Sequence, residues 1–257
     1  MQSARIKLAF TVLLFSIIGL LAPAQAQEAP PEELSASAYL SDGAGDYSTQ
    51  VIGGDAADNR GIAAVLLDGR PSCSGSILSN YWILTAKHCV REGDGNGDKY
   101  NYSRLTVRVK SEYADTGGGV VSVVLTKSRD DHDLAVIKLG RSANAESVSL
   151  ASAHAAVGST TYVFGYGTSA YPNRLLRGTE RVASNDFPGI MTTAIDGRPC
   201  HGDSGGPLFK LVDGSRFQIG VVSRLPQSDP SDCSAGRTVY SSVPNSKDWI
   251  ETVMRDF

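Results

Sequence analysis

Short apolar stretches separated by polar turns run through residues 51–257. Residues 105–110, Leu-Thr-Val-Arg-Val-Lys, alternate apolar and polar side chains, which is typical of a half-buried β-strand. The pattern predicts strong strands over 62–67, 76–85, 105–110, 120–127, 134–139, 160–165, 217–223 and 238–243.

Clusters of Gly, Asp, Asn and Pro lie between these segments, as in 91–100 (REGDGNGDKY) and 169–174 (SAYPNR). Such clusters are typical of turns. No repeat with a period of about 20 to 50 residues is visible, which argues against solenoids and propellers. Many short strands with few helical stretches predict an all-β barrel or sandwich.

One helix is predicted near the C-terminus, within 245–257. Asn245 or Ser246 can cap its first turn. Four apolar side chains then fall on one face, namely Trp249, Ile250, Val253 and Met254. Trp249 is therefore expected to anchor the helix by packing.

The first 26 residues have the composition of a secretory signal peptide. Arg5 and Lys7 precede an apolar run over 8–22, and the ending Ala24-Gln25-Ala26 suits cleavage after Ala26. An apolar run of about fifteen residues is short for a membrane span. We therefore expect a secreted protein, extracellular or periplasmic, with no membrane association after the signal peptide is removed.

Residues 27–50 differ in composition from the rest of the chain. Pro, Ser, Ala and Gly are frequent, and the stretch contains five acidic residues but no Lys or Arg. A stretch of this kind folds poorly by itself. It is either a disordered linker or a removable pro-segment.

The remaining chain is neutral and contains four cysteines. The whole chain has 24 Lys and Arg against 27 Asp and Glu, and the first 50 residues hold two of the former and five of the latter. Residues 51–257 thus carry equal numbers of positive and negative side chains, which implies neither a nucleic-acid partner nor a membrane surface.

An even number of cysteines in a secreted chain predicts two disulfides, with three connectivities possible. No pair has C-x-x-C spacing and His is scarce, which argues against a zinc site.

A candidate nucleophile, Ser204, lies in the glycine-rich segment 200–208, CHGDSGGPL. A serine hydroxyl becomes a strong nucleophile when a base accepts its proton and a third group orients that base. Of the four histidines, His88 ends an apolar β stretch beside a cysteine, whereas His154 lies in a bland segment and His201 is three residues from Ser204. His132 adjoins Asp133, which directly precedes a predicted strand and is placed for burial.

Three blocks, TAKHC (85–89), DHDLAVIKL (131–139) and CHGDSGGPL (200–208), resemble in this order the signature blocks of the chymotrypsin/trypsin-like serine peptidases. Further matches cover most of 51–255: VIGGD at 51, CSGSIL at 73, VFGYGTS at 163, IGVVS at 219 and TVYSSVPNSKDWI at 238. The resemblance implies two antiparallel six-stranded Greek-key β-barrels with a C-terminal α-helix, in a peptidase domain over 51–257.

The resemblance also implies roles for individual residues. His88 would be the general base and then the general acid, Asp133 would orient it, and Ser204 would attack the scissile carbonyl. The N–H groups of Gly202 and Ser204 would form the oxyanion hole. Two disulfides are implied, Cys73 with Cys89 and Cys200 with Cys233, and Ser223 matches the family serine that hydrogen-bonds the orienting aspartate.

In this family an acid at the position of Asp203 pairs with an α-amino group created by cleavage. Here that amine would belong to Val51, which favours a pro-segment over 27–50. A buried carboxylate without a partner is costly, so the precursor and the mature form should differ in loop order. Because 27–50 lack Lys and Arg, the activating protease must cut after Gln50, unless the cut lies elsewhere, and trypsin-type self-activation is excluded.

In the family, the residue six before the nucleophile lies at the floor of the substrate side-chain pocket, and here it is Arg198. Trypsin-like members carry an acid there, so a preference for Lys or Arg is not expected. Arg198 either points inward and selects Asp or Glu side chains, or is turned to solvent by Pro199, or plugs the pocket.

Two further departures concern the pocket walls. Ser223-Arg224-Leu225 stands where Ser-Trp-Gly is usual, and Thr238 stands where a glycine is usual. Both changes should narrow the pocket, so small or acidic substrate side chains are expected rather than large aromatic ones.

The combined expectation is a secreted serine endopeptidase, made as a zymogen, that acts on protein or peptide substrates as a monomer. No cofactor or metal is expected: Asp94 to Asp98 resemble the opening of a calcium loop, but Leu105 stands where an EF-hand has its closing glutamate. The main alternative is a catalytically silent homologue that binds a partner through the same cleft. A hydrolase of small esters is a third possibility.

Overall fold

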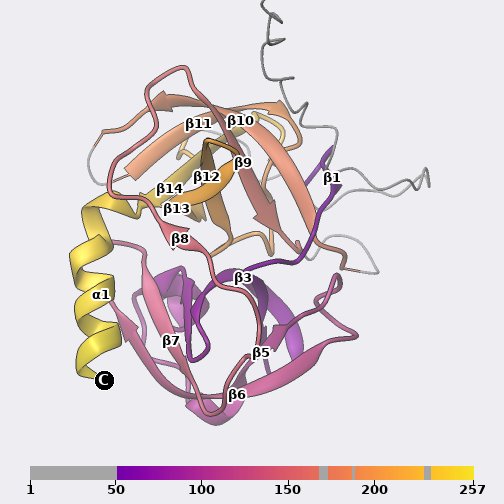
Figure 1. Cartoon of the computed structure of the whole chain (residues 1–257), viewed down its shortest axis with the longest axis vertical. Coiled ribbons are helices and arrows are strands. Elements are labelled where there is room, and N and C mark those ends of the chain that lie inside the picture. Colours follow the sequence, from indigo (N-terminus) through magenta and orange to yellow (C-terminus); the bar gives the residue numbers. More distant parts are fainter. Residues whose placement is uncertain (1–50, 168–172, 187–188, 229–232) are drawn as a thin grey trace, which may run out of the picture. The chain divides into compact units, whose positions relative to one another are not determined.

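The structure is a computed structural model, and it describes residues 51–167, 173–186, 189–228 and 233–257 (Figure 1). All of them belong to the compact unit Tyr39–Phe257. The predicted signal peptide, 1–26, and the predicted pro-segment, 27–50, lie outside the described residues.

Six antiparallel strands close the N-terminal barrel in the order β2-β3-β4-β7-β6-β5. Their bounds are β2 Ile62–Leu67, β3 Arg70–Ser79, β4 Trp82–Thr85, β5 Leu105–Val109, β6 Gly119–Ser128 and β7 Ala135–Leu139. In β5 the apolar residues Leu105, Val107 and Val109 are buried and the polar residues between them are partly exposed. The alternation read from the sequence is therefore the inward and outward face of a barrel strand.

A second barrel is built from the C-terminal half of the chain. Its strands are β9 Thr160–Gly165, β10 Leu176–Ser184, β11 Gly189–Asp196, β12 Pro207–Val212, β13 Ser215–Arg224 and β14 Arg237–Ser242. They follow the order β9-β10-β11-β14-β13-β12, and β12 pairs with β9 to close the ring. Two short strands join its edges, β1 Asp55–Ala56 on β10 and β8 Ser149–Leu150 on β13. The expected fold class is confirmed.

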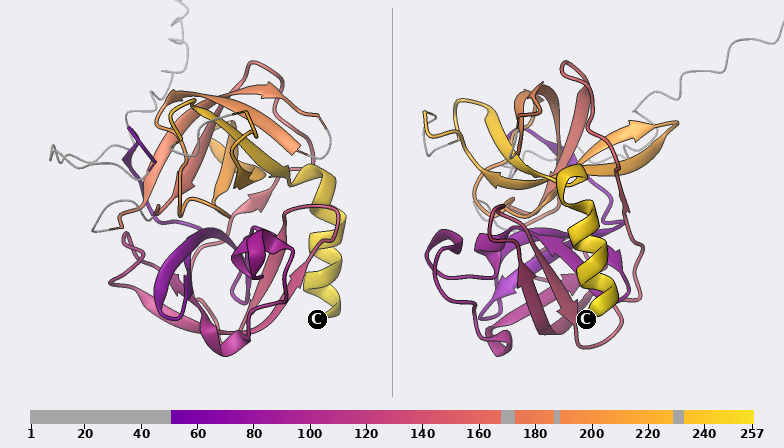
Figure 2. Two further views of the ribbon diagram at one scale, coloured as in Figure 1. Left: turned by 180° about the vertical axis from the view of Figure 1, so that it is seen from behind. Right: turned by 90° about the vertical axis from the view of Figure 1, so that its left-hand side faces the viewer.

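A C-terminal helix, α1 (Lys247–Asp256), follows a 3₁₀ turn and runs along the outside of the N-terminal barrel (Figure 2). Ser246 is its N-cap residue, although its side chain makes no capping hydrogen bond. Ile250 and Val253 are buried in the same core cluster as the first barrel, and Trp249 and Met254 pack against it. No helix among the described residues is both long and apolar enough to cross a membrane.

The structure corrects the strand predictions in two places. The segment 76–85 is not one strand, because β3 ends at Ser79 and a turn at Asn80 and Tyr81 leads into β4. Three strands of the second barrel, β10, β11 and β12, were not predicted. β10 and β11 carry many charged and hydroxyl side chains, so their apolar signal is weak, and β12 directly follows the glycine pair of the segment that carries Ser204.

Three short 3₁₀ turns lie in loops of the first barrel. Residues 93–95, at the start of the calcium-like motif, form a 3₁₀ turn inside a bridge between Arg91 and Lys99. Two further 3₁₀ turns, Lys87–Cys89 and Tyr102–Arg104, follow β4 and precede β5. The first of these turns carries His88.

Candidate active site

His88 and Asp133 lie at the same end of the first barrel. His88 follows β4 and Asp133 precedes β7, and these two strands pair with Thr85 opposite Ala135. The His88 Nδ1 atom lies 2.9 Å from Asp133 Oδ2, and the His88 backbone N–H donates to Asp133 Oδ1 at 3.0 Å. The carboxylate therefore fixes both the position and the tautomer of the imidazole.

The second barrel also binds Asp133. The Ser223 hydroxyl donates to Asp133 Oδ2 at 2.7 Å, and the Ser241 hydroxyl donates to the Asp133 carbonyl at 2.7 Å. Burial pushes the pKa of Asp133 up, but the hydrogen bonds and positive charge of His88 and the hydrogen bond of Ser223 hold it below its ordinary value. Asp133 is thus an ionised group held by both barrels.

Glycines shape the loop that carries Ser204. Gly202 and Gly205 have φ of 87° and 81°, in the left-handed region that favours glycine. A Cβ on Gly205 would lie 2.1 Å from Thr85 Oγ1. The loop can therefore approach the first barrel only because this position has no side chain.

Several carbonyls of this loop accept backbone hydrogen bonds. The carbonyls of Cys200, Asp203 and Gly206 accept from the N–H groups of Asp203, Gly206 and Val222, at 3.1, 2.9 and 2.9 Å. The N–H groups of Gly202 and Ser204 have no acceptor among the described residues. Two free donors in one tight turn can stabilise a negatively charged oxygen.

Two disulfides hold these segments, Cys73–Cys89 and Cys200–Cys233. The sulfur of Cys89, next to His88, lies 3.7 Å from the Ser204 carbonyl oxygen. The Ser204 hydroxyl makes no hydrogen bond to a described residue. The structure thus places Ser204 beside the histidine turn and forms the His88–Asp133 contact, and without substrate the contact between serine and histidine is often long.

Val51 and Ile52 pack against the second barrel. Val51 is fully buried in the core of the second barrel, and Ile52 and Arg198 exchange two backbone hydrogen bonds of 2.9 and 3.0 Å. The Asp203 carboxylate is also fully buried and accepts N–H bonds from Gly167 and Cys200, both at 2.9 Å. Burial raises the pKa of Asp203 to about 8, so this acid holds a proton near neutral pH.

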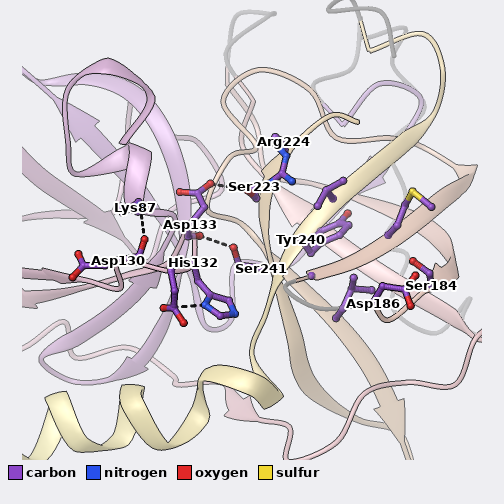
Figure 3. A pocket seen from close by; sticks show the side chains of 15 residues that line it. Lys87, Asp130, His132, Asp133, Ser184, Asp186, Ser223, Arg224, Tyr240 and Ser241 are labelled. Carbon is purple, nitrogen blue, oxygen red and sulfur yellow. Dashed lines mark hydrogen bonds and ion pairs between the residues drawn. The ribbon is translucent and has the colours of Figure 1, made fainter. Parts of the chain in front are cut away.

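Two of the six predicted specificity residues line a pocket. A pocket of about 240 Å³ opens between the barrels against Asp133, and Ser223 and Arg224 line it with Lys87 and His132 (Figure 3). Four predicted specificity residues do not line it: Arg198, Pro199, Leu225 and Thr238. Arg198 is half-buried, and its Nε is buried without a hydrogen-bond partner among the described residues.

A second buried acid, Glu180, was not found from the sequence. It is fully buried on β10 and accepts hydrogen bonds from the hydroxyls of Thr192 (2.9 Å), Thr238 (3.4 Å) and Tyr240. Thr238 therefore turns its hydroxyl toward Glu180. Because β10 was not predicted as a strand, the sequence could not show which of its side chains point into the barrel.

Comparisons with known proteins show what the chain is similar to. Residues 51–250 match the family model named Trypsin. Trypsin beta of Drosophila erecta is 31% identical over 212 residues, which cover 71% of this chain and 78% of that protein. Snake venom serine protease CL5 of Trimeresurus stejnegeri is 31% identical over 244 residues, which cover 80% of this chain and 88% of that protein.

Replacing Glu180 by Gln should change how stability depends on pH. Burial raises the pKa of Glu180 from 4.5 to about 7, although its three hydroxyl donors act in the opposite direction. Between these values the folded chain holds a proton that the unfolded chain has lost, so the free energy of unfolding falls as pH rises, by about 1.4 kcal/mol per pH unit for one proton. Glu180→Gln should remove the contribution of Glu180 to the dependence of the unfolding free energy on pH. The contribution of Asp203, whose pKa is also raised, should remain.

Urea unfolding of the wild type and the variant at several pH values between about 4.5 and 7 measures the two slopes. Glu146→Gln, a change at an exposed glutamate, serves as the control and should leave the slope unchanged. Equal slopes for wild type and Glu180→Gln would show that Glu180 is ionised throughout this range.

Proposed function

This chain belongs to the trypsin family of serine peptidases and is a serine endopeptidase, and on that premise we propose that His88, Asp133 and Ser204 form its catalytic triad. The observation that carries the assignment is the 2.9 Å contact between His88 Nδ1 and Asp133 Oδ2, beside a loop with two free N–H donors.

Hydrolysis proceeds in two halves. The Ser204 Oγ attacks the scissile carbonyl while His88 Nε2 accepts the hydroxyl proton, and Asp133 stabilises the imidazolium that forms. The N–H groups of Gly202 and Ser204 bind the oxyanion. His88 then donates its proton to the leaving amine, and a water molecule activated by the same imidazole hydrolyses the acyl-enzyme.

The precursor is made with a signal peptide over 1–26 and a pro-segment over 27–50. The two disulfides suit a protein that matures in an oxidising compartment, extracellular or periplasmic. A protease that cuts after Gln50 frees the α-amino group of Val51, which pairs with Asp203. Support comes from the burial of Val51 and from Asp203, which has no cationic partner among the described residues.

The specificity pocket is proposed to accept small or acidic side chains, with Arg198 as the acid-selecting group. The backbone of Arg198 is fixed by Ile52, and Pro199 is buried next to it. A half-buried guanidinium with a buried Nε that has no partner among the described residues can bind a substrate carboxylate in two parallel hydrogen bonds. Arg198 would thus exclude Lys and Arg side chains by charge.

Labelling with an organophosphonate tests the triad. The activated chain should be modified at Ser204, and peptide hydrolysis should fall by about 10⁴-fold or more in Ser204→Ala and His88→Ala. Mass spectrometry locates the label, and a denatured protein panel measures proteolysis. A catalytically silent homologue would remain unlabelled, and an esterase would turn over esters but leave the panel intact.

The activation pair predicts a loss of activity in Asp203→Asn. The ion pair should raise the pKa of the Val51 amine above its ordinary value of about 8. The active loop is then fully present at lower pH and is lost as pH rises through the raised value. Activity of chain correctly cut before Val51 should therefore decline in alkaline solution, and Asp203→Asn should be inactive throughout.

Asp213→Asn provides a matched control, because Asp213 lies in an exposed turn with φ of 49°, which asparagine also tolerates. It should keep the full pH profile. Full activity of cut Asp203→Asn would exclude the proposed activation pair while leaving the triad untouched.

Cleavage of a peptide library tests Arg198. The wild type should favour Asp or Glu before the scissile bond over the amide analogues, and Arg198→Ser should abolish that preference without lowering the cleavage of small side chains. Arg70→Ser, at an exposed arginine on β3, is the control. An unchanged library profile in Arg198→Ser would remove Arg198 from the pocket.

A further inference from the structure

We propose that Ser74 is a positioning residue for the oxyanion-binding loop: its buried hydroxyl joins the Tyr166 N–H to the Gly202 carbonyl and so sets the direction of the two free N–H groups. The inference rests on the proposed role of Ser204 and its loop, and it concerns a residue outside the triad.

Ser74 lies on β3 and is fully buried. Its hydroxyl oxygen lies 3.0 Å from the Gly202 carbonyl oxygen and 3.0 Å from the Tyr166 nitrogen. A backbone N–H can only donate and a carbonyl can only accept, so the hydroxyl accepts from Tyr166 and donates to Gly202. Both the orientation of the hydroxyl and its two partners are thereby determined.

The same residue also holds Ser204 through its backbone. The Ser74 N–H donates to the Ser204 carbonyl at 2.8 Å, and the Ser74 carbonyl accepts from the Thr85 hydroxyl at 2.8 Å. Ser74 adjoins Cys73, whose disulfide partner Cys89 follows His88. One residue of the first barrel therefore contacts two carbonyls of the nucleophile loop of the second.

The position of the Gly202 carbonyl explains why the hydroxyl matters. The two free N–H groups belong to the peptide units before Gly202 and before Ser204, and the Gly202–Asp203 peptide lies between them. Its orientation sets ψ of Gly202 and φ of Asp203, and these torsions determine whether the two N–H groups converge. Glycine has the widest torsional freedom, so this peptide is the part of the loop that most needs an external restraint.

The other partner of the hydroxyl belongs to the same system. Tyr166 directly precedes Gly167, whose N–H donates to the buried Asp203 carboxylate at 2.9 Å. The Tyr166 side chain is itself buried, with its hydroxyl donating to the Ser111 carbonyl at 2.7 Å. Ser74 thus connects the loop to the segment that also binds the Asp203 side chain.

Comparing Ser74→Ala with Ser76→Ala tests the proposal. Ser76 is a matched control because it is also fully buried on β3, but its hydroxyl donates to the Gln218 side chain at 2.7 Å. With the full chain, secreted and activated, we expect kcat for an ester and a peptide to fall about tenfold in Ser74→Ala, the usual effect of one neutral hydrogen bond, while KM changes less than twofold. Ser76→Ala should keep kcat.

Amide hydrogen exchange supplies a readout that does not depend on catalysis. The Tyr166 amide should exchange faster in Ser74→Ala than in wild type or Ser76→Ala, since its acceptor has been removed. Unchanged kcat with unchanged Tyr166 exchange, or an equal loss of kcat in both variants, would overturn the proposal. If wild type shows no turnover, the proposed function fails, and the exchange rates at Tyr166 and Asp203 still decide whether Ser74 orders the loop.

Discussion

The carboxylate of Asp133 is the group on which the arrangement of the two barrels depends. It is a charged side chain placed between them, and a buried charge is stable only when its hydrogen bonds are made. His88 of the first barrel and Ser223 of the second supply donors to the carboxylate, and Ser241 binds the carbonyl of the same residue. The carboxylate that orients the imidazole is therefore also bound by the second barrel.

The loop that carries Ser204, residues 200–206, also depends on which of its polar groups are hydrogen-bonded, but these are backbone groups instead of charged side chains. Its carbonyls at 200, 202, 203, 204 and 206 all accept hydrogen bonds, partly within the loop and partly from β3 and β13, while two N–H groups have no acceptor among the described residues. A loop with every donor satisfied would offer nothing to an oxyanion, and a loop with free carbonyls would repel one. Left-handed glycines make this uneven distribution possible, because they allow successive peptides to turn without side-chain clashes.

How much of this could be predicted from the sequence depended on the kind of signal. Alternating strands such as β5 and apolar strands such as β2 were predictable, and two of the signature blocks contain His88 and Asp133, which the structure brings into contact. Strands β10 and β11 were missed because polar side chains that pair inside or around the barrel weaken the apolar pattern. Glu180 and Ser74 were missed for a stronger reason: their partners lie up to 128 positions away, and only the fold brings them together.

The helix α1 has a consequence for the order in which the molecule can be built. Its residues Ile250 and Val253 follow both barrels in the sequence, yet they complete the core of the barrel whose strands come first. The first barrel therefore cannot reach its final packing until the strands of the second barrel have been made. Without α1, the apolar side chains of the first barrel that the helix covers would be exposed to water.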